Sequence, residues 1–211
     1  MEGAAREGLL RPETRLVSLM AVNNETGVIQ PVRELVRRVR AVHSSAGGGR
    51  PVLIHSDAVQ AFGRIPLALG EWGVDALTVA AHKLGGPKGV GAVALREGLR
   101  IPPLLLGGRQ ERDRRAGTES VALVEGFLGA AEWVLGQFAA LNERIGALRD
   151  RLLGHLSGTP GYFLNGEGAP RVPNTANLGF EGATAQSLLV ALDLQGVAVS
   201  TGSACSSGSI E

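Results

Sequence analysis

Length, composition and charge already narrow the class of this protein. The 211 residues are 44% hydrophobic and 19% charged, which is the composition of a folded chain and excludes a globally disordered one. Basic and acidic residues nearly cancel (21 against 20), and only two Trp, one Tyr and five Phe are available to stack on bases, so we expect no nucleic-acid partner.

No targeting or membrane segment stands out in the sequence. Residues 1–8 lack the apolar core of a secretory signal, and no stretch reaches the about 18 consecutive apolar residues that a membrane span needs. We therefore expect a cytoplasmic protein without a membrane partner. The single cysteine, Cys205, cannot form an internal disulfide, so the fold does not depend on an oxidising compartment.

The first half of the chain has the pattern of an α/β protein with a mostly parallel sheet. Residues 15–22 form an apolar run typical of a buried strand. Pro31 begins an expected helix, whose apolar side chains recur at three-and-four spacing until the glycines at 47–49. The glycine-rich residues 84–89 form a tight loop but match no nucleotide-binding motif. Further strands are expected at residues 52–55, 76–80 and 90–96.

The second half begins with a long amphipathic pattern. Apolar residues step by threes and fours from Val121 to Leu152, which predicts one long helix. After a Gly/Pro-rich turn, short strands at 174–180 and 197–200 flank an expected helix at 186–194. The sequence therefore predicts three parts: an incomplete large domain over 1–120, a linking helix over 121–157, and an incomplete small domain over 158–211.

Polar residues follow three of the expected strands, as Asn24, Asp57 and Lys83. Ligands of parallel sheets bind beyond the carboxyl ends of the strands, so these side chains mark the first candidate site. The Lys83 amine can form a Schiff base with a carbonyl cofactor such as pyridoxal phosphate, or it is a solvated surface lysine. Asp57 can keep the pyridine nitrogen of that cofactor protonated, or it caps a helix. His55 shares a strand face with Asp57, and Gln60 lies in the turn beyond.

Two further side chains are suited to chemistry. Cys205 lies among Ser, Thr, Gly and Ala residues, so its thiolate suits a nucleophile on a loop; the alternative is a small buried side chain. His82 precedes Lys83 and either moves protons or has a structural role. The four histidines and one cysteine have no metal-ligand spacing, so we expect no metal site.

Five motifs in this order resemble those of the cysteine desulfurases, class V members of the fold-type I pyridoxal phosphate enzymes. The resemblance runs from residue 15 to residue 211. It rests on residues 23–27 (NNETG), 55–60 (HSDAVQ), 82–89 (HKLGGPKG), 107–118 (GGRQERDRRAGT) and 203–207 (SACSS). It implies the α/β large domain of that fold type with a mostly parallel sheet, a long linking helix and a partial α+β small domain.

The resemblance also implies roles for residues in these motifs. Lys83 would hold pyridoxal 5'-phosphate covalently, Asp57 would pair with its ring nitrogen, and Gln60 would contact its ring hydroxyl. The other implied cofactor contacts are Asn24, His82, which also handles protons, and Thr118.

The same resemblance implies a route of sulfur transfer and the formation of a homodimer. Cys205 would attack the sulfur of the substrate L-cysteine, leaving L-alanine and a persulfide for an iron–sulfur scaffold or a sulfur-carrier protein. The segment through Thr118 corresponds to a contact across a homodimer. A selenocysteine lyase shares the fold and the lysine and is the nearest alternative, although the Ser-Ala-Cys-Ser-Ser loop favours the desulfurase.

Three features depart from the family pattern. Ala80 stands where the family has a Ser or Thr hydroxyl on the cofactor phosphate, a bond of about 1.5–3 kcal/mol. Arg109 replaces a usual glycine, and our hypothesis is that it adds positive charge near that phosphate across the dimer interface. Family members are longer at both ends, where they carry a phosphate-binding helix N-terminus, a ring-stacking residue and a carboxylate-binding arginine. A second hypothesis is therefore a truncated, non-catalytic dimerising or partner-binding remnant.

Overall fold

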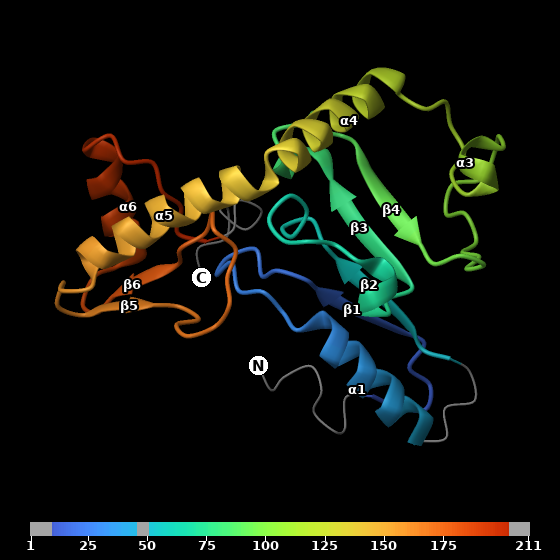
Figure 1. Ribbon diagram of the computed structural model, residues 1–211, viewed down its shortest axis with the longest axis horizontal. Helices are drawn as coiled ribbons and strands as arrows, with labels where there is room; N and C mark the ends of the chain where they lie inside the picture. Colours follow the sequence, from blue (N-terminus) through green and yellow to red (C-terminus); the bar gives the residue numbers. More distant parts are fainter. Residues whose placement is uncertain (1–9, 46–50, 203–211) are drawn as a thin grey trace. The chain divides into compact units, whose positions relative to one another are not determined.

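The computed structural model of the chain describes residues 10–45 and 51–202 (Figure 1). Its internal contacts divide the chain into two compact units. Unit 1 comprises Met1–Ala21 and Gln30–Phe138, and unit 2 comprises Val22–Ile29 and Ala139–Glu211. The short segment Val22–Ile29 thus leaves unit 1 and the chain returns to it before the first helix.

Unit 1 is built on a four-stranded sheet with the strand order β1-β2-β3-β4. The strands are β1 (Leu16–Met20), β2 (Leu53–Asp57), β3 (Ala76–Ala80) and β4 (Gly91–Leu95). The first three run parallel, whereas β4 pairs antiparallel with β3. The expected mostly parallel sheet is therefore confirmed, and its three parallel strands are those whose apolar runs predicted them.

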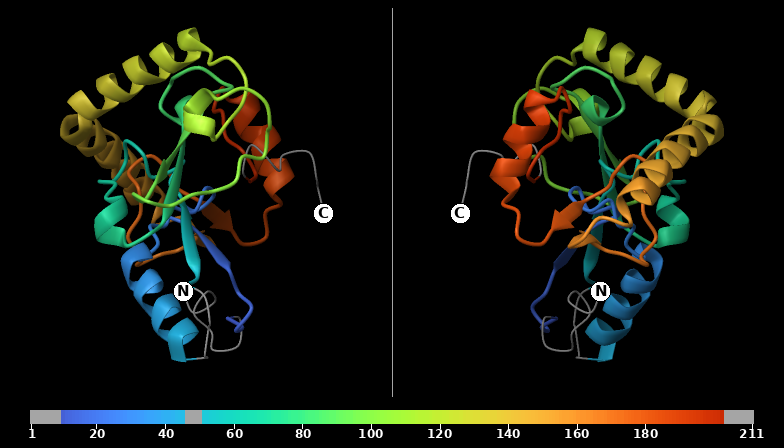
Figure 2. Two further views of the ribbon diagram at one scale, coloured as in Figure 1. Left: turned by 90° about the vertical axis from the view of Figure 1, so that its right-hand side faces the viewer. Right: turned by 90° about the vertical axis from the view of Figure 1, so that its left-hand side faces the viewer.

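Helix α1 (Val32–Ser45) and the short α2 (Leu69–Trp72) lie on the same side of this sheet (Figure 2). Buried side chains alternate along β2, as the pleat requires, and form one stripe on α1. These core residues are Leu19, Ile54, Ser56, Leu77, Val32, Leu35, Val36 and Val39. The opposite face of the sheet carries the half-buried side chains of His55, Asp57 and Thr78.

A buried carboxylate fixes β2 beside the start of β3. Asp75 is only 2% exposed. Its carboxylate accepts hydrogen bonds from the Ile54 N–H at 2.9 Å, from Arg96 at 2.8 Å and from Arg40 of α1 at 3.3 Å. The Asp75 N–H donates in turn to the Ile54 carbonyl at 2.7 Å. These bonds compensate the desolvation of the charge and hold helix, strand and loop together.

The single helix expected over residues 121–152 is wrong, because the structure has two helices, α4 (Val121–Gly136) and α5 (Phe138–Leu156). They are separated at Gln137, whose φ of −116° and ψ of 16° are not helical. Gly136, a poor helix former, precedes the break. Within residues 10–45 and 51–202, no single helix is long and apolar enough to cross a membrane, and only α4 and α5 counted together across the break reach that length and composition.

Unit 2 pairs β5 (Tyr162–Leu164) antiparallel with β6 (Leu178–Phe180), and α6 (Ala185–Leu194) follows. Thr184 caps α6 by accepting the Ser187 N–H at 3.2 Å. The helix is confirmed, whereas β5 is not predicted by the sequence pattern and the strand expected from residue 174 is restricted to β6. Residues 197–200 form no strand, and the Val197 N–H donates instead to the Leu192 carbonyl of α6 at 2.9 Å.

Candidate active site

Asp57 ends β2 with one carboxylate oxygen already engaged. In the register of the parallel sheet Asp57 lies between Met20 of β1 and Thr78 of β3. Its Oδ1 accepts the Val59 N–H at 2.9 Å, and its carbonyl accepts the Ala21 N–H at 2.8 Å. The carboxylate thus caps a turn rather than a helix. Its Oδ2 accepts no hydrogen bond from any residue that the structure describes, and so it is available to a ligand.

A histidine lies two residues before Asp57 on the same face of the sheet. The His55 ring is hydrogen-bonded on both sides, with Nδ1 at 2.7 Å from the Ser18 hydroxyl and Nε2 at 3.1 Å from the Thr78 hydroxyl. Sequence reasoning placed His55 beside Asp57 but did not find Ser18 or Thr78. Their role depends on strand register, which no local pattern reveals.

The turn after Asp57 and the turn that carries Lys83 are joined directly. Arg64 donates from Nη2 to the Lys83 carbonyl at 3.4 Å, and burial lowers the pKa of its guanidinium. Gly63 sits against Leu84, the residue after Lys83, and against Val134 of α4. Phe62 meets Phe127 of α4 edge to face, with ring centroids 6.2 Å apart. The half-buried Gln60 lies in the same turn.

Lys83 ends a short 3-10 turn, η1 (Ala81–Lys83), that directly follows β3. The turn is closed by the N–H groups of Leu84 and Gly86, which donate to the Ala81 carbonyl at 2.9 and 3.1 Å. Lys83 is half-buried, and in the described part of the chain its ammonium forms neither an ion pair nor a hydrogen bond. The neighbouring His82 is exposed. An unpaired, partly desolvated amine on a rigid turn is suited to condense with a carbonyl group.

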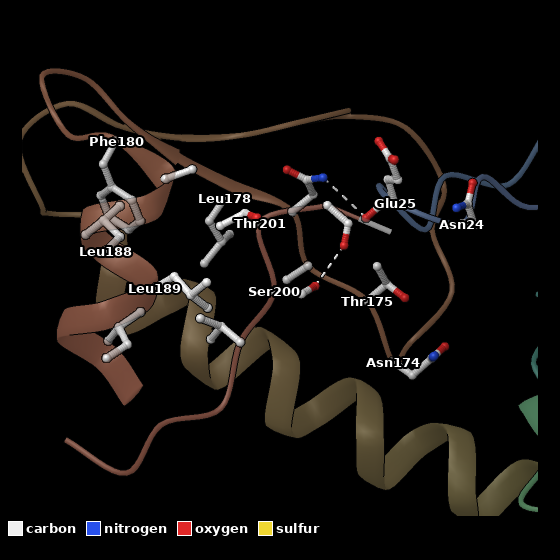
Figure 3. A pocket seen from close by; sticks show the side chains of 16 residues that line it. Asn24, Glu25, Asn174, Thr175, Leu178, Phe180, Leu188, Leu189, Ser200 and Thr201 are labelled. Atoms are coloured by element: carbon white, nitrogen blue, oxygen red, sulfur yellow. Dashed lines mark hydrogen bonds between the residues drawn. The ribbon is translucent and has the colours of Figure 1, made fainter. Parts of the chain in front are cut away.

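Asn24 lies in unit 2, in the wall of a pocket of about 370 Å³ (Figure 3). The segment that carries it is held by backbone bonds from Ile29 to Pro170 at 2.8 Å and from Val172 to Gly27 at 2.9 Å. Apolar side chains gather at one end of the pocket and polar ones at the other (Figure 3). The apolar side chains are Leu178, Phe180, Leu188 and Leu189, and the polar ones are Asn24, Glu25, Asn174 and Thr175.

The same pocket is lined by the last described residues of the chain. Ser200, Thr201 and Gly202 complete its wall, and the Ser200 hydroxyl donates to the Gly202 carbonyl at 2.8 Å. The NNETG motif and the stretch just before the SACSS motif therefore meet in unit 2. Cys205, the proposed nucleophile, lies outside the described residues.

The remaining candidate residues lie in unit 1 on an exposed connection. Thr118 is exposed between α3 (Gln110–Asp113) and α4. Arg109 is also exposed, with a long ion pair of 4.0 Å to Asp113. The three residues 111–113 of α3 have φ values of 51 to 62°, a left-handed conformation that is strained for side chains other than glycine. Ala80, at the end of β3, offers no hydroxyl.

No cluster of three or more His, Cys, Asp or Glu side chains suitable for a metal occurs among residues 10–45 and 51–202. The candidate residues of unit 1 offer the amine of Lys83, the carboxylate of Asp57 and the amide of Gln60. This donor set fits an organic carbonyl cofactor with a basic ring nitrogen.

Known proteins resemble the chain over nearly its whole length. The cysteine desulfurase NifS of Azotobacter vinelandii is 44% identical over 204 residues, which cover 96% of this chain and 49% of the relative. The cysteine desulfurase IscS of Dictyoglomus turgidum is 43% identical over 203 residues, covering 96% and 50%. The chain thus spans about half the length of the curated relatives it matches.

Solved structures lead to the same fold. A NifS-like protein from Rickettsia africae has a TM-score of 0.81 at 32% identity, with 94% of this chain and 53% of that chain covered. DndA from Streptomyces lividans has a TM-score of 0.72 at 40% identity, with 88% and 51% covered. Residues 2–211 match the family described as aminotransferase class-V. The chain therefore belongs to the class-V aminotransferase family.

Proposed function

We propose that this chain is the part of a cysteine desulfurase that holds pyridoxal 5'-phosphate and takes sulfur from L-cysteine. The observation that carries the proposal is the link between the Asp57 turn and the Lys83 turn through Arg64 and Gly63. Asp57 ends β2 and Lys83 follows the neighbouring parallel strand β3, and the Lys83 amine and the Asp57 Oδ2 have no hydrogen-bond partner among the residues that the structure describes. The curated relatives named as cysteine desulfurases support the same function.

The residues present fit this cofactor. Lys83 supplies the amine that a carbonyl group needs, and Asp57 keeps Oδ2 for a protonated ring nitrogen, because Val59 occupies only Oδ1. Gln60 follows in the turn and is assigned to the ring hydroxyl. When bound, pyridoxal phosphate withdraws electrons from the amino acid joined to it.

Proton transfer is assigned to the lysine and its neighbour. The Lys83 amine, held on a turn fixed by Ala81 and Arg64, would take and return the proton of the substrate Cα. His82 is exposed and exchanges protons with solvent.

Sulfur transfer is assigned to Cys205. Its thiolate attacks the sulfur of bound L-cysteine, the Cβ–S bond breaks with its electrons left on carbon, and a proton on that carbon completes L-alanine. Cys205 keeps the sulfur as a persulfide for an iron–sulfur scaffold or a sulfur carrier.

The cofactor phosphate requires donors that this chain supplies only in part. Ala80 lacks a hydroxyl, so we assign phosphate contacts to Thr118 and Arg109 of a second copy in a cytoplasmic homodimer. Both residues are exposed on the connection that contains the strained α3. Exposure of both side chains supports a contact made in trans.

Covalent attachment of the cofactor tests the proposal. Lys83 and Lys88 are the only lysines in the sequence, and Lys88 is exposed in the same loop. The chain is incubated with pyridoxal phosphate, reduced with borohydride and mapped by mass spectrometry. We expect a pyridoxyl group on Lys83 that Lys83→Ala abolishes and Lys88→Ala retains.

The same preparation is then given L-cysteine. Release of L-alanine that Cys205→Ser abolishes supports the desulfurase. Equal labelling of both lysines contradicts the assigned site. Specific labelling without alanine release contradicts activity of this chain by itself while leaving the cofactor site in place.

A further inference from the structure

We propose that His55 is a positioning residue for Asp57, which it holds by cross-linking β1, β2 and β3 just before the end of the strands. The inference rests on the proposed function, because it concerns the carboxylate assigned to the cofactor ring nitrogen. The HSDAVQ motif contains His55 but gives it no role. The inference comes from two side-chain hydrogen bonds that join residues 37 and 23 positions apart.

The cross-link spans all three parallel strands. Ser18 is the register partner of His55 on β1, and Thr78 of β3 is the register partner of Asp57. One imidazole therefore reaches the strands on both sides, with contacts of 2.7 Å and 3.1 Å. Because alternate residues of a strand share a face, this cross-link of Ser18, His55 and Thr78, here called the bridge, lies on the side of the sheet that carries Asp57.

The bridge lies next to the backbone bonds that hold the Asp57 turn. The Ala21 N–H donates to the Asp57 carbonyl at 2.8 Å, and the Ala58 N–H donates to the Thr78 carbonyl at 2.9 Å. Both bonds extend the strand ladders by one residue beyond the sheet. The direction of Oδ2 depends on these two bonds and on the Val59 cap, so a change in strand separation here turns the carboxylate.

The chemistry of the bridge makes it independent of the charge on the ring. A hydroxyl both donates and accepts, so Ser18 and Thr78 can each bond either a neutral or a protonated imidazole. Removal of the ring nitrogens leaves the half-buried Thr78 hydroxyl without its imidazole partner, whereas the exposed Ser18 hydroxyl can bond water instead. The cost falls on the strand ends, because the far end of β2 is fixed separately by Asp75.

The test compares His55→Phe, Ser18→Ala and Thr78→Val with His155→Phe, a control histidine exposed on α5. Amide hydrogen exchange is measured on the full chain without cofactor. We expect His55→Phe to accelerate exchange of the Ala21 and Ala58 amides about fivefold, the ratio for loss of one hydrogen bond. The Asp75 amide, which bonds Ile54, should keep its rate.

A second readout uses 4'-deoxypyridoxine 5'-phosphate, a cofactor analogue without the aldehyde, which binds without reacting with Lys83. Its ultraviolet spectrum reports protonation of the ring nitrogen. We expect His55→Phe to weaken binding about fivefold and to lower the pH at which the bound ring loses its proton. Ser18→Ala and Thr78→Val should each weaken binding of the analogue and lower the pH of ring deprotonation, by less than His55→Phe does.

Each outcome decides between alternatives. Unchanged exchange at Ala21 and Ala58, or an unchanged ring titration in the bound analogue, overturns the proposal. Equal acceleration across the sheet, Asp75 included, assigns His55 only a general structural role and also overturns it. If the unmodified chain binds no analogue, the proposed function fails, whereas local acceleration confined to Ala21 and Ala58 still supports His55 as the residue that fixes this edge.

Discussion

Gly63 shows how one residue holds the two candidate turns together. Its φ is +73°, and a Cβ at this position would lie 2.6 Å from Cγ1 of Val134 and 2.8 Å from Cδ2 of Leu84. Both neighbours are buried branched side chains, so neither can move away without disturbing the packing around Lys83. Any side chain at residue 63 therefore meets two separate costs, one of backbone conformation and one of overlap.

Gly63→Ala is expected to destabilise the chain more than Gly98→Ala. Gly98 has a φ of +76°, but a Cβ added there would meet nothing within 4 Å. Gly98→Ala therefore has the cost of the backbone conformation but no cost of overlap. The difference between the two variants isolates the overlap, which is worth about 1–3 kcal/mol for an overpacked site. Urea unfolding of both variants measures it. Equal losses of unfolding free energy would show that the neighbours relax freely.

Individual site residues differ in how far the sequence predicts them. Asp57 and Lys83 are predicted because each follows an apolar run, and the structure puts both at the ends of parallel strands. Arg64 could not be found in this way, since its bond to the Lys83 carbonyl depends on how two turns pack. Their roles in catalysis stay predictions until the labelling experiment is done.

At the scale of elements, α1 carries a charge cluster on its exposed side. Glu34 in its first turn accepts hydrogen bonds from Arg37 at 2.8 and 2.9 Å and from Arg38 at 2.7 Å. Hydrogen bonds from Arg37 and then Arg38 lower the pKa of the carboxyl from 4.5 to about 2. A carboxylate near a helix N-terminus also interacts favourably with the helix dipole.

The lowered pKa gives a pH dependence of known sign. Because the folded chain binds a proton at Glu34 less readily than the unfolded chain, the stabilisation is complete above pH 4.5 and is lost as the pH falls towards 2. Glu34→Gln should therefore lower the melting temperature at pH 7 and make a shrinking difference below pH 4.5. In a chain that already carries Arg37→Gln and Arg38→Gln, the effect of Glu34→Gln on the melting temperature should not shrink as the pH falls. A difference in melting temperature between Glu34→Gln and the unmodified chain that stays constant with pH would contradict the lowered pKa of Glu34.

Elements with a strong local pattern are those that the sequence predicts. The apolar stripe of α1 and the apolar runs of β1 and β3 are long enough for the sequence pattern to predict these elements. Strand β3 begins and ends at the expected residues. The short β5 has only three residues, too few for an alternation. The break at Gln137 is missed because apolar spacing continues across it, and the left-handed turn of α3 at 111–113 contradicts the propensity of its residues.

At the scale of the whole molecule, large apolar side chains remain on the surface. In unit 1 the connection before α3 exposes Leu104 and Leu106 by 94% and 83%. The segment also leads to Arg109 and Thr118, the residues proposed to serve a second copy. Contiguous exposed apolar surface of this kind marks an interaction site or a tendency to aggregate.

Substitution of both leucines tests whether this surface forms the homodimer. We expect the unmodified chain to sediment as a dimer at micromolar concentration and Leu104→Ser/Leu106→Ser to sediment as a monomer that still unfolds cooperatively, since side chains this exposed contribute little to the folding of a single chain. Leu194→Ser is the matched control, because Leu194 is 79% exposed on α6 of unit 2. If the control dissociates the dimer and the double variant does not, the interface lies on unit 2, and the assignment of the Leu104 and Leu106 surface to the dimer is wrong. If the double variant alone dissociates and also loses pyridoxal phosphate labelling at Lys83, the cofactor site of each copy depends on the other.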